Sequence, residues 1–291
     1  MHMDMKPASP ETIQTRLGKP WNEVARLADE HTMAVQVWLS TRAPRAARME
    51  TQGIKAGSTG EQVRLLNLAL GSNFPPGTSD EAIAADIEAV KSFFAARAAP
   101  WYWWLGPTPR PPDMAQRLER HGLAFDRPPL PALVAPLPSY GPALNPDANV
   151  WLASNRADLE AASTIRRIAF RFPDGVATDY FEAMASDWLG GDPARLYLAC
   201  LGDGPPAAIG ASIMGAGVPG VYVMATLPEW CRRGLGKAIL ARILADATAE
   251  GHELIVLTAS RLGYLLYRQF GFEHVFDYEI YRPVEDGKRE A

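Results

Sequence analysis

A short basic, glycine-rich segment is the part of the chain most suited to chemistry. It reads Arg232-Arg233-Gly234-Leu235-Gly236-Lys237, and it lies between an apolar run at 221–226 and a helical pattern that continues to about 249. The first N–H groups of a helix have no intrahelical partner and carry partial positive charge. Glycine lets a phosphate approach the backbone closely, and arginine can bind phosphate with two parallel hydrogen bonds. The segment therefore predicts an anion site at a helix start.

Two common phosphate motifs do not fit this segment. The Walker A pattern requires a glycine where Cys231 stands and a serine or threonine where Ala238 stands. The dinucleotide fingerprint requires a third glycine, and Ile239 occupies that place. A phosphate-bearing ligand of another class is therefore expected.

Residues from about 150 to 283 resemble the GNAT-type N-acetyltransferase superfamily. The pyrophosphate loop of that family reads Gln/Arg-x-x-Gly-x-Gly/Ala, with a proline a few residues earlier, and Pro228 and 232–236 are similar to it. A second stretch, 264–272, resembles the family motif Ala-x-x-Leu-Tyr-x-x-x-Gly-Phe, with Gly263 for the alanine. Cys231 departs from the pattern, because the family has glutamine or arginine there; Arg232 could replace that contact. Two motifs in the right order, about thirty residues apart, are much more specific than either alone.

The resemblance implies acetyl-CoA as co-substrate, no metal, and a role for each matching residue. Tyr267 would be the general acid that protonates the departing thiolate. Pantetheine would enter between the strand before the loop and its splayed neighbour, and backbone N–H groups there would polarise the thioester carbonyl. The residues implied for cofactor binding are Met224, Ala225, Thr226, Arg232, Arg233, Gly234, Leu235, Gly236 and Lys237.

The implied reaction is direct attack of a primary amine of a small molecule or peptide on the thioester. An alkylamine has a pKa near 10.4, so a base or a desolvated pocket must remove a proton. Glu182, Asp187 and Glu229 are candidates for that base by charge alone, and the sequence does not choose among them. A non-catalytic acyl-CoA-binding or regulatory module is the alternative function. Cys231 could be a reactive thiol or simply a small loop residue.

The first half resembles a degenerate GNAT copy, as found in tandem GNAT proteins. Residues 62–125 contain a tryptophan-rich run, then Gly106-Pro107, a proline-rich turn and a short helix before Gly122. No Arg-x-x-Gly-x-Gly follows any expected strand in this half, so loss of CoA binding is expected there. The tryptophans at 101, 103 and 104 favour core packing, with an aromatic acceptor pocket as the alternative.

The order of the expected elements in the C-terminal half implies a mixed sheet with helices on both faces. The resemblance implies an α/β protein of two GNAT-like domains, each a mixed, mostly antiparallel sheet flanked by helices on both faces. The expected domains are 1–135 and 150–285, joined by a proline-rich linker at 136–149. A helix is expected at 10–31, a strand at 35–39, loop at 41–59 and a helix from Ser79 to about 98. The stretch 132–135 could be an edge strand of the first domain.

Composition excludes several other classes. The formal net charge of −4 argues against a nucleic-acid surface, and so weakens an RNA or DNA role for the two arginines. The two cysteines form no metal or disulfide framework, which favours a reducing cytoplasm. No signal peptide and no apolar run long enough to cross a membrane are expected.

Overall fold

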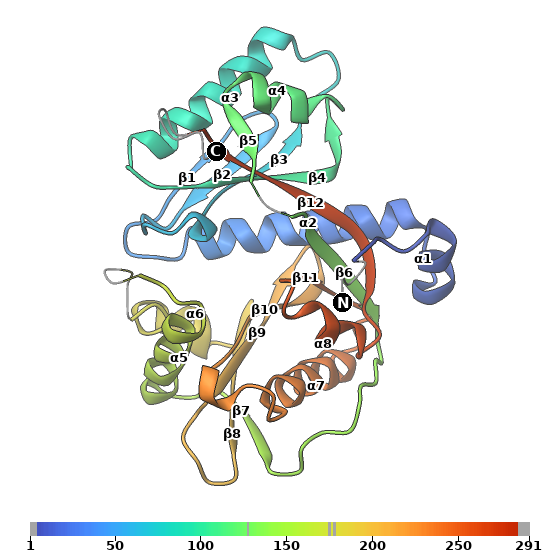
Figure 1. Cartoon of the computed structure of the whole chain (residues 1–291), viewed down its shortest axis with the longest axis vertical. Helices are drawn as coiled ribbons and strands as arrows, with labels where there is room; N and C mark the ends of the chain where they lie inside the picture. The colour runs from blue at the N-terminus through green and yellow to red at the C-terminus, as the bar shows by residue number, and fades with distance from the viewer. Residues whose placement is uncertain (1–4, 127, 174–175, 177–178, 285–291) are drawn as a thin grey trace, which may run out of the picture. The chain divides into compact units, whose positions relative to one another are not determined.

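The computed structural model describes residues 5–126, 128–173, 176 and 179–284, and they form two compact units. Unit 1 consists of the described residues up to Val35 together with Pro131–Phe276. Unit 2 consists of Gln36–Leu130 and the described residues from Asp277 onward. Figure 1 colours the chain by residue number and so shows which segments build each unit.

Unit 1 is built on a mixed sheet with the order β7-β8-β9-β10-β11-β6, followed by β12. Its strands are β6 (Leu130–Pro136), β7 (Ala148–Leu152), β8 (Ala194–Leu201), β9 (Ala208–Gly215), β10 (Val218–Thr226), β11 (Leu254–Thr258) and the start of β12 (Glu273–Pro283). The pairs from β7 to β10 are antiparallel, β10 and β11 are parallel, and β11 and β6 are antiparallel. The predicted mixed, mostly antiparallel sheet is confirmed for this unit.

Helices cover both faces of the sheet of unit 1 (Figure 1). On one face α7 (Leu235–Ala249) contacts β7 to β10, with α8 (Tyr264–Arg268) beside it. On the other face α5 (Arg156–Ala169) contacts β9 and β10, and α6 (Ala185–Leu189) contacts β8 after the 3₁₀ turn η2 (Glu182–Met184). Val221 packs in the core under α7, so by strand alternation Gly220 and Tyr222 face the opposite side.

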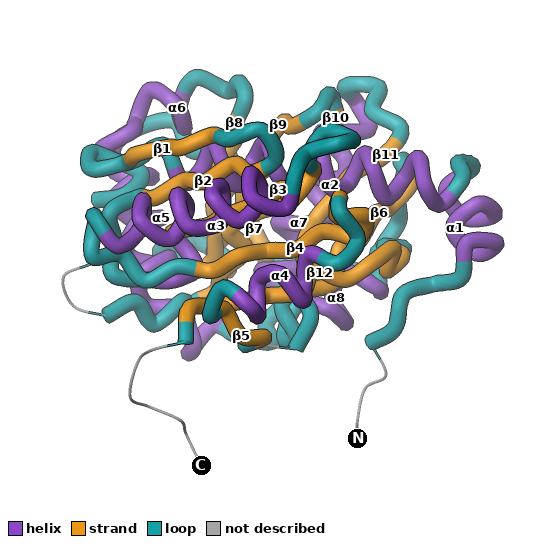
Figure 2. The backbone as a smooth tube through the Cα atoms, turned by 90° about the horizontal axis from the view of Figure 1, so that it is seen from above, coloured by secondary structure: helices purple, strands orange, loops and turns teal. Residues whose placement is uncertain are grey.

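Unit 2 has its own mixed sheet, with the order β1-β2-β3-β4 followed by the end of β12, which also pairs with β5. The strands are β1 (Ala47–Glu50), β2 (Ile54–Ser58), β3 (Asn67–Asn73), β4 (Tyr102–Arg110) and β5 (Leu123–Phe125). The helices α3 (Asp80–Ala95) and α4 (Met114–Arg120) pack on it (Figures 1 and 2). Trp101 and Trp103 are buried in this core and Trp104 is buried against Tyr278, so core packing is confirmed for the tryptophans.

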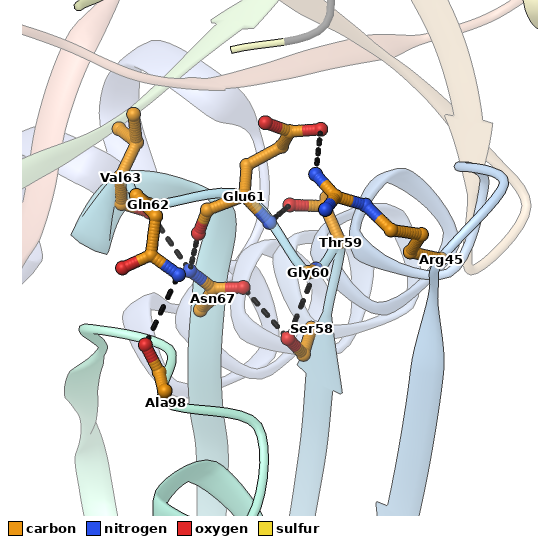
Figure 3. A network of polar contacts seen from close by, with 9 residues as sticks. All are labelled: Arg45, Ser58, Thr59, Gly60, Glu61, Gln62, Val63, Asn67 and Ala98. Carbon is orange, nitrogen blue, oxygen red and sulfur yellow. Dashed lines mark hydrogen bonds and ion pairs between the residues drawn. The ribbon is translucent and has the colours of Figure 1, made fainter. Parts of the chain in front are cut away.

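A buried asparagine closes the loop between β2 and β3 in unit 2 (Figure 3). The amide nitrogen of Asn67 donates to the carbonyls of Glu61, Val63 and Pro100, and its oxygen accepts from the Ser58 hydroxyl at 2.7 Å. Arg45 forms an ion pair of 3.2 Å with Glu61 at the rim of this network. The network satisfies the backbone of the turn that includes η1 (Arg64–Leu66), which accounts for the conformation of the loop.

Several sequence predictions need correction. The strand expected at 35–39 is the end of the helix α2 (Trp21–Ser40), which follows the shorter helix α1 (Pro10–Leu17). Val24, Ala28, His31 and Val35 are buried at helical spacing, so the packed face overrides the β-propensity of the Val-x-Val run. The loop expected at 41–59 contains β1 and β2, strands too short and too polar to give a clear pattern.

The division into units also differs from the predicted boundaries at 135 and 150. The stretch 132–135 is not an edge strand of the first domain, because β6 pairs with β11 from Ala132↔Thr258 to Pro136↔Leu254. The end of β12 instead pairs with β4 in unit 2, with Glu279 opposite Leu105. Pairing between strands far apart in sequence decides to which unit a strand belongs. The proline content of a segment marks only where regular pairing stops.

His31 fixes α2 on the hairpin formed by β9 and β10. Its Nδ1 lies 2.9 Å from the carbonyl oxygen of Gly215 and 3.1 Å from that of Val218. Two carbonyls can only accept, so Nδ1 carries the proton. Burial lowers the pKa of His31 from 6.5 to about 4, because the imidazolium is desolvated there.

This buried histidine predicts a pH-dependent stability. Between pH 6.5 and about 4 the unfolded chain takes up a proton that the folded chain refuses, so stability is full above pH 6.5 and falls as the pH drops to about 4. The loss should approach about 3 kcal/mol, from about 1.4 kcal/mol per pKa unit. Urea unfolding at a series of pH values measures it. His31→Asn should flatten this part of the profile, and an unchanged slope in that variant would contradict the assignment.

Candidate active site

Strand β10 carries a break in its regular geometry directly before the phosphate-loop segment. Its register with β9 is regular from Val218↔Gly215 to Tyr222↔Ala211 and then shifts before Ala225↔Ile209. Within this bulge Val223 has a φ of 52°, a conformation that β-branched residues rarely adopt. Such strain persists only where the surrounding structure imposes it, and it is concentrated at functional sites.

The bulge coincides with the separation of β10 from β11. The only pair of residues in register between these strands, among the described residues, is Gly220↔Val256. Met224, Ala225 and Thr226 have no pair on β11, and all three are half-buried. Their backbone groups on that side are available to a ligand, because a strand edge without a partner leaves its N–H and C=O groups unpaired. In the register Gly220↔Val256, β11 ends at Thr258, so Met224, Ala225 and Thr226 extend beyond its last residue, and the splay implied by the family resemblance stays a prediction.

The loop after β10 presents several N–H groups to one point. It passes through the 3₁₀ turn η3 (Pro228–Trp230) and reaches Arg232 and Gly234, which have left-handed φ values of 61° and 93°. Alternating left-handed residues orient successive N–H groups toward a common anion. Gly234 is the N-cap of α7 and supplies no side-chain cap, and the first helical bond is from the Ala238 N–H to the Gly234 carbonyl at 3.0 Å. The N–H groups of Leu235, Gly236 and Lys237 thus form the start of the helix without a capping side chain.

The charged residues of the loop are held at its surface. Arg232 and Arg233 are exposed, and the Arg233 guanidinium lies 4.9 Å from the centre of the Trp230 ring. The side-chain amide of Asn145 donates to the Arg233 carbonyl at 2.9 Å and so supports the loop from the preceding connection. The sequence alone did not point to Asn145 or Trp230, because neither lies in a motif. Only their contacts with Arg233 in the structure connect them to the loop.

Two details concern Cys231 and Gly236. The Cys231 thiol donates to the carbonyls of Thr226 and Leu227, at 3.8 and 3.5 Å, so it ties the exposed loop back to the end of β10. A Cβ at Gly236 would lie 3.7 Å from Leu266 Cδ2 and 4.0 Å from Thr226 Oγ1, which is ordinary contact. Gly236 therefore brings the start of α7 close to the end of β10 and to α8 without being crowded itself.

Tyr267 lies on α8, next to Leu266. It is 7% exposed, and its ring packs against Gly263 and meets Phe272 edge-on, with 5.8 Å between ring centres. Burial raises the pKa of Tyr267, because the phenolate would be desolvated. The hydroxyl is therefore protonated at neutral pH, as a proton donor must be.

The three carboxylates considered as bases occupy unlike places. Glu182 accepts a hydrogen bond from the Ser163 hydroxyl, and Asp187 lies near Tyr180, whose pKa burial and that carboxylate raise. Glu229 is exposed in η3. These contacts connect Glu182 and Asp187 to Ser163 and Tyr180 rather than to Tyr267, so they do not identify the base.

Other possible sites do not coincide with this one. A shallow depression of about 550 Å³ is lined by α1 and the start of α2, among them Pro10, Gln14 and Trp21, and contains none of the residues above. Within the described ranges there is no group of three or more His, Cys, Asp or Glu side chains able to hold a metal ion. The described helices also include none with the length and apolarity of a membrane span.

Unit 2 provides an internal contrast at the corresponding place in its sheet. There β3 and β4 are also parallel, but four consecutive pairs join them from Leu68↔Tyr102 to Gly71↔Leu105. The helix that follows, α3, is capped by the Ser79 hydroxyl on the Ala82 N–H and has Asp80 and Glu81 in its first turn. After Gly71 the pairing shifts register to Asn73↔Arg110, and Ser72 has a left-handed φ of 66°, so a strand irregularity before the helix is common to both units. The acidic, capped helix start is the feature that makes a bound pyrophosphate unfavourable in unit 2.

Comparison with known proteins finds a family match in unit 1. Residues 212–275 match the family model of the acetyltransferase (GNAT) domain. No curated protein matches the chain. A GCN5-related N-acetyltransferase from Kribbella flavida superposes with a TM-score of 0.64 at 22% identity, covering 90% of this chain and 95% of that one.

Two further solved structures have the same arrangement over almost the whole chain. A GCN5-related N-acetyltransferase from Sphaerobacter thermophilus gives a TM-score of 0.60 at 15% identity, with 97% and 96% coverage. A tandem GNAT protein from the clavulanic acid biosynthesis pathway gives 0.59 at 14% identity, with 98% of both chains covered. At these identities the likeness shows the fold. The chain thus has the two-domain fold of tandem GNAT proteins, with its GNAT domain match in the C-terminal half.

The loop geometry predicts that Gly234 is far less replaceable than Gly236. In Gly234→Ala the new Cβ would lie 3.0 Å from Asn145 Cβ in a left-handed residue, which should cost about 1–2 kcal/mol. Gly236→Ala, with an uncrowded site in the first turn of α7, should leave stability unchanged or raise it by up to about 1 kcal/mol. Urea unfolding of both variants measures the difference, and equal stabilities would contradict this reading of the loop.

Proposed function

We propose that this protein transfers the acetyl group of acetyl-CoA to a primary amine of a small molecule or peptide, by direct attack in a ternary complex. The match of residues 212–275 to the GNAT acetyltransferase domain supports acyl transfer in general. Acetyl-CoA as donor, the amine as acceptor and the mechanism are parts of the proposal. The proposed setting is the cytoplasm, with the free thiols of Cys200 and Cys231 kept reduced.

One observation carries the proposal: the separation of β10 from β11 leads directly to the uncapped, basic start of α7. The first feature offers backbone hydrogen bonds to an extended amide-bearing arm, and the second offers N–H groups and charge to phosphates. Acetyl-CoA contains both parts in one molecule, an amide-bearing pantetheine arm joined to a pyrophosphate. In unit 2 the corresponding helix start is capped by Ser79 and carries Asp80 and Glu81 in its first turn.

The cofactor-binding roles follow from these positions. The N–H groups of Leu235, Gly236 and Lys237, with the charges of Arg232 and Arg233, would hold the pyrophosphate. Met224, Ala225 and Thr226 would bond pantetheine in place of the missing pairs with β11. Gly234 sets the backbone direction at the helix start, and Leu266 and Thr226 border the path beside Gly236.

The proposed reaction uses the strand bulge and Tyr267. The neutral amine attacks the thioester carbon, and backbone N–H groups freed by the bulge stabilise the developing oxyanion. The C–N bond forms, the C–S bond breaks, and Tyr267 gives its proton to the departing thiolate. The raised pKa of Tyr267 keeps it protonated until then.

The most direct binding test is calorimetry with acetyl-CoA on the wild type and on Gly236→Glu. A Cβ at position 236 is accommodated in the free protein, since it would lie 3.7 Å from Leu266 Cδ2 and 4.0 Å from Thr226 Oγ1. It would place a negative charge at the proposed pyrophosphate, so binding should be lost while unfolding stability is kept.

Ala82→Glu is the matched control, because it puts the same residue in the first turn of α3 in unit 2. It should bind acetyl-CoA as the wild type does. Absence of binding to the folded wild type, or undiminished binding to Gly236→Glu, would overturn the proposed site.

Catalysis is tested with Tyr267→Phe in an acceptor screen that includes spermidine, tyramine, glucosamine and lysine-containing peptides. Loss of the hydroxyl should lower kcat by roughly 10²–10⁴-fold, the usual contribution of general acid–base catalysis. The dissociation constant for acetyl-CoA should not change, because the ring remains. An unchanged kcat would remove Tyr267 from the mechanism, and acetyl-CoA binding without turnover of any amine would favour a non-catalytic binding module.

A further inference from the structure

The proline-rich connection between β6 and β7 contacts both sequence motifs of unit 1. Near its start the Ser139 hydroxyl donates to the Phe270 carbonyl, in the turn after α8. Gly141 lies against the Phe270 ring, since a Cβ there would be 2.1 Å from Cε1 of that ring. Near its end Asn145 donates to the Arg233 carbonyl in the basic loop. The segment that the sequence suggested as a linker between domains therefore borders the candidate site.

The amide of Asn145 has its orientation fixed by two partners. Its oxygen accepts the N–H of Asp147 at 3.0 Å, and its nitrogen donates to the carbonyl of Arg233 at 2.9 Å. A backbone N–H can only donate and a carbonyl can only accept, so turning the amide over would lose both bonds. The main-chain carbonyl of Asn145 also accepts the Ala148 N–H at 3.1 Å. Asn145 therefore links the basic loop to the start of β7.

The base of this link belongs to the sheet. The carbonyl of Asp147 accepts the N–H of Gly202 at 2.8 Å, and β7 is paired with β8 from Ala148↔Leu201 onward. The hydrogen bond that Asn145 gives to the loop is thus referred to a paired strand, whose position does not depend on the loop.

This hydrogen bond acts on the peptide group between Arg233 and Gly234. A trans peptide is planar, and its N–H points opposite to its carbonyl. Because the Arg233 carbonyl is held toward Asn145, the Gly234 N–H points away from Asn145. The same bond restrains the torsions on either side of the peptide, one of which is the left-handed φ of 93° at Gly234. That torsion directs the chain into α7.

Two further contacts hold the loop in this conformation. A Cβ on Gly234 would lie 3.0 Å from Asn145 Cβ, so Asn145 lies directly against the left-handed residue. At the other end of Arg233, the guanidinium lies 4.9 Å from the centre of the Trp230 ring. The exposed loop is thus ordered before a ligand arrives, and a preorganised loop loses less conformational entropy on binding.

We propose that Asn145 is a positioning residue for the pyrophosphate of acetyl-CoA. It holds the Arg233–Gly234 peptide so that the Gly234 N–H joins those of Leu235 and Gly236 at the bound anion. The inference rests on the proposed function and adds to it a residue outside both motifs. Asn145 acts through the loop backbone, so its contribution is made to a donor that contains the pyrophosphate and to no other.

The test compares two acetyl donors on Asn145→Ala, with the amine selected by the acceptor screen. S-acetylpantetheine has the thioester and the amide-bearing arm but lacks the pyrophosphate. For acetyl-CoA we expect kcat/KM to fall by about 3–10-fold, the usual effect of one hydrogen bond, through a raised KM at unchanged kcat. For S-acetylpantetheine kcat/KM should not change. A general loss of structure would instead lower both values.

Asn149→Ala is the matched control. The side-chain amide of Asn149 donates to the carbonyl of Gly202 at 2.8 Å, so the same substitution removes a similar bond four residues further along the chain. It should leave both donors as they are in the wild type. Calorimetry with acetyl-CoA should show the same factor as KM in Asn145→Ala and no change in Asn149→Ala.

An unchanged acetyl-CoA affinity in folded Asn145→Ala, or an equal loss of kcat/KM for both donors, would overturn the positioning role and leave the proposed function intact. A wild type that binds no acetyl-CoA would overturn both. If the wild type binds acetyl-CoA but turns over no amine, the calorimetric comparison of Asn145→Ala with Asn149→Ala decides.

If Asn145→Ala does not fold, Asn145→Asp replaces it, because the carboxylate keeps the acceptor for the Asp147 N–H and lacks the donor to Arg233. Its added charge is screened at about 1 M salt. Acetyl-CoA binding weaker than that of the wild type at that salt supports the positioning role, and recovery of the wild-type affinity contradicts it.

Discussion

The interrupted pairing between β10 and β11 is the constraint on which the candidate site depends. Parallel neighbours in a sheet normally satisfy each other's backbone along their length, yet here the register pairing is confined to Gly220↔Val256. The left-handed conformation of Val223 allows β10 to stay paired with β9 while it leaves β11. The unpaired backbone then continues directly into the uncapped start of α7. In the proposed site, main-chain groups therefore supply most of the contacts to the ligand.

The two units differ locally at the start of the helix that follows the corresponding strand. Each has a strand followed by a loop, a helix and a parallel strand. In unit 2 the strands keep four consecutive pairs before a register shift after Gly71, and the helix start is capped by Ser79 and carries the acidic residues Asp80 and Glu81. In unit 1 the strands separate, and Gly234 leaves the helix start open beside two arginines. Trp101 and Trp103 are buried in the core of unit 2.

Local signals in the sequence predicted the elements around the proposed site, and long-range pairing accounts for what they missed. The glycines and arginines of 232–236 and the stretch 264–272 are short, contiguous patterns, and the elements around them are where the sequence places them. The pairing of β6 with β11 and of the end of β12 with β4 could not be predicted, because a strand's own residues do not identify its partner. His31 was missed for the same reason: its significance arises from contacts with residues nearly two hundred positions away. The extension of α2 through 35–39 shows packing overriding local propensity.

Amide hydrogen exchange with and without acetyl-CoA tests the central claim most directly, because the claim concerns backbone N–H groups. The account predicts slower exchange in peptides that cover 223–226 and 235–238 when acetyl-CoA is bound, with no change in peptides that cover β3 and the start of α3. Slower exchange in the α3 region alone, or unchanged exchange in both strand–helix segments despite saturating acetyl-CoA, would contradict it.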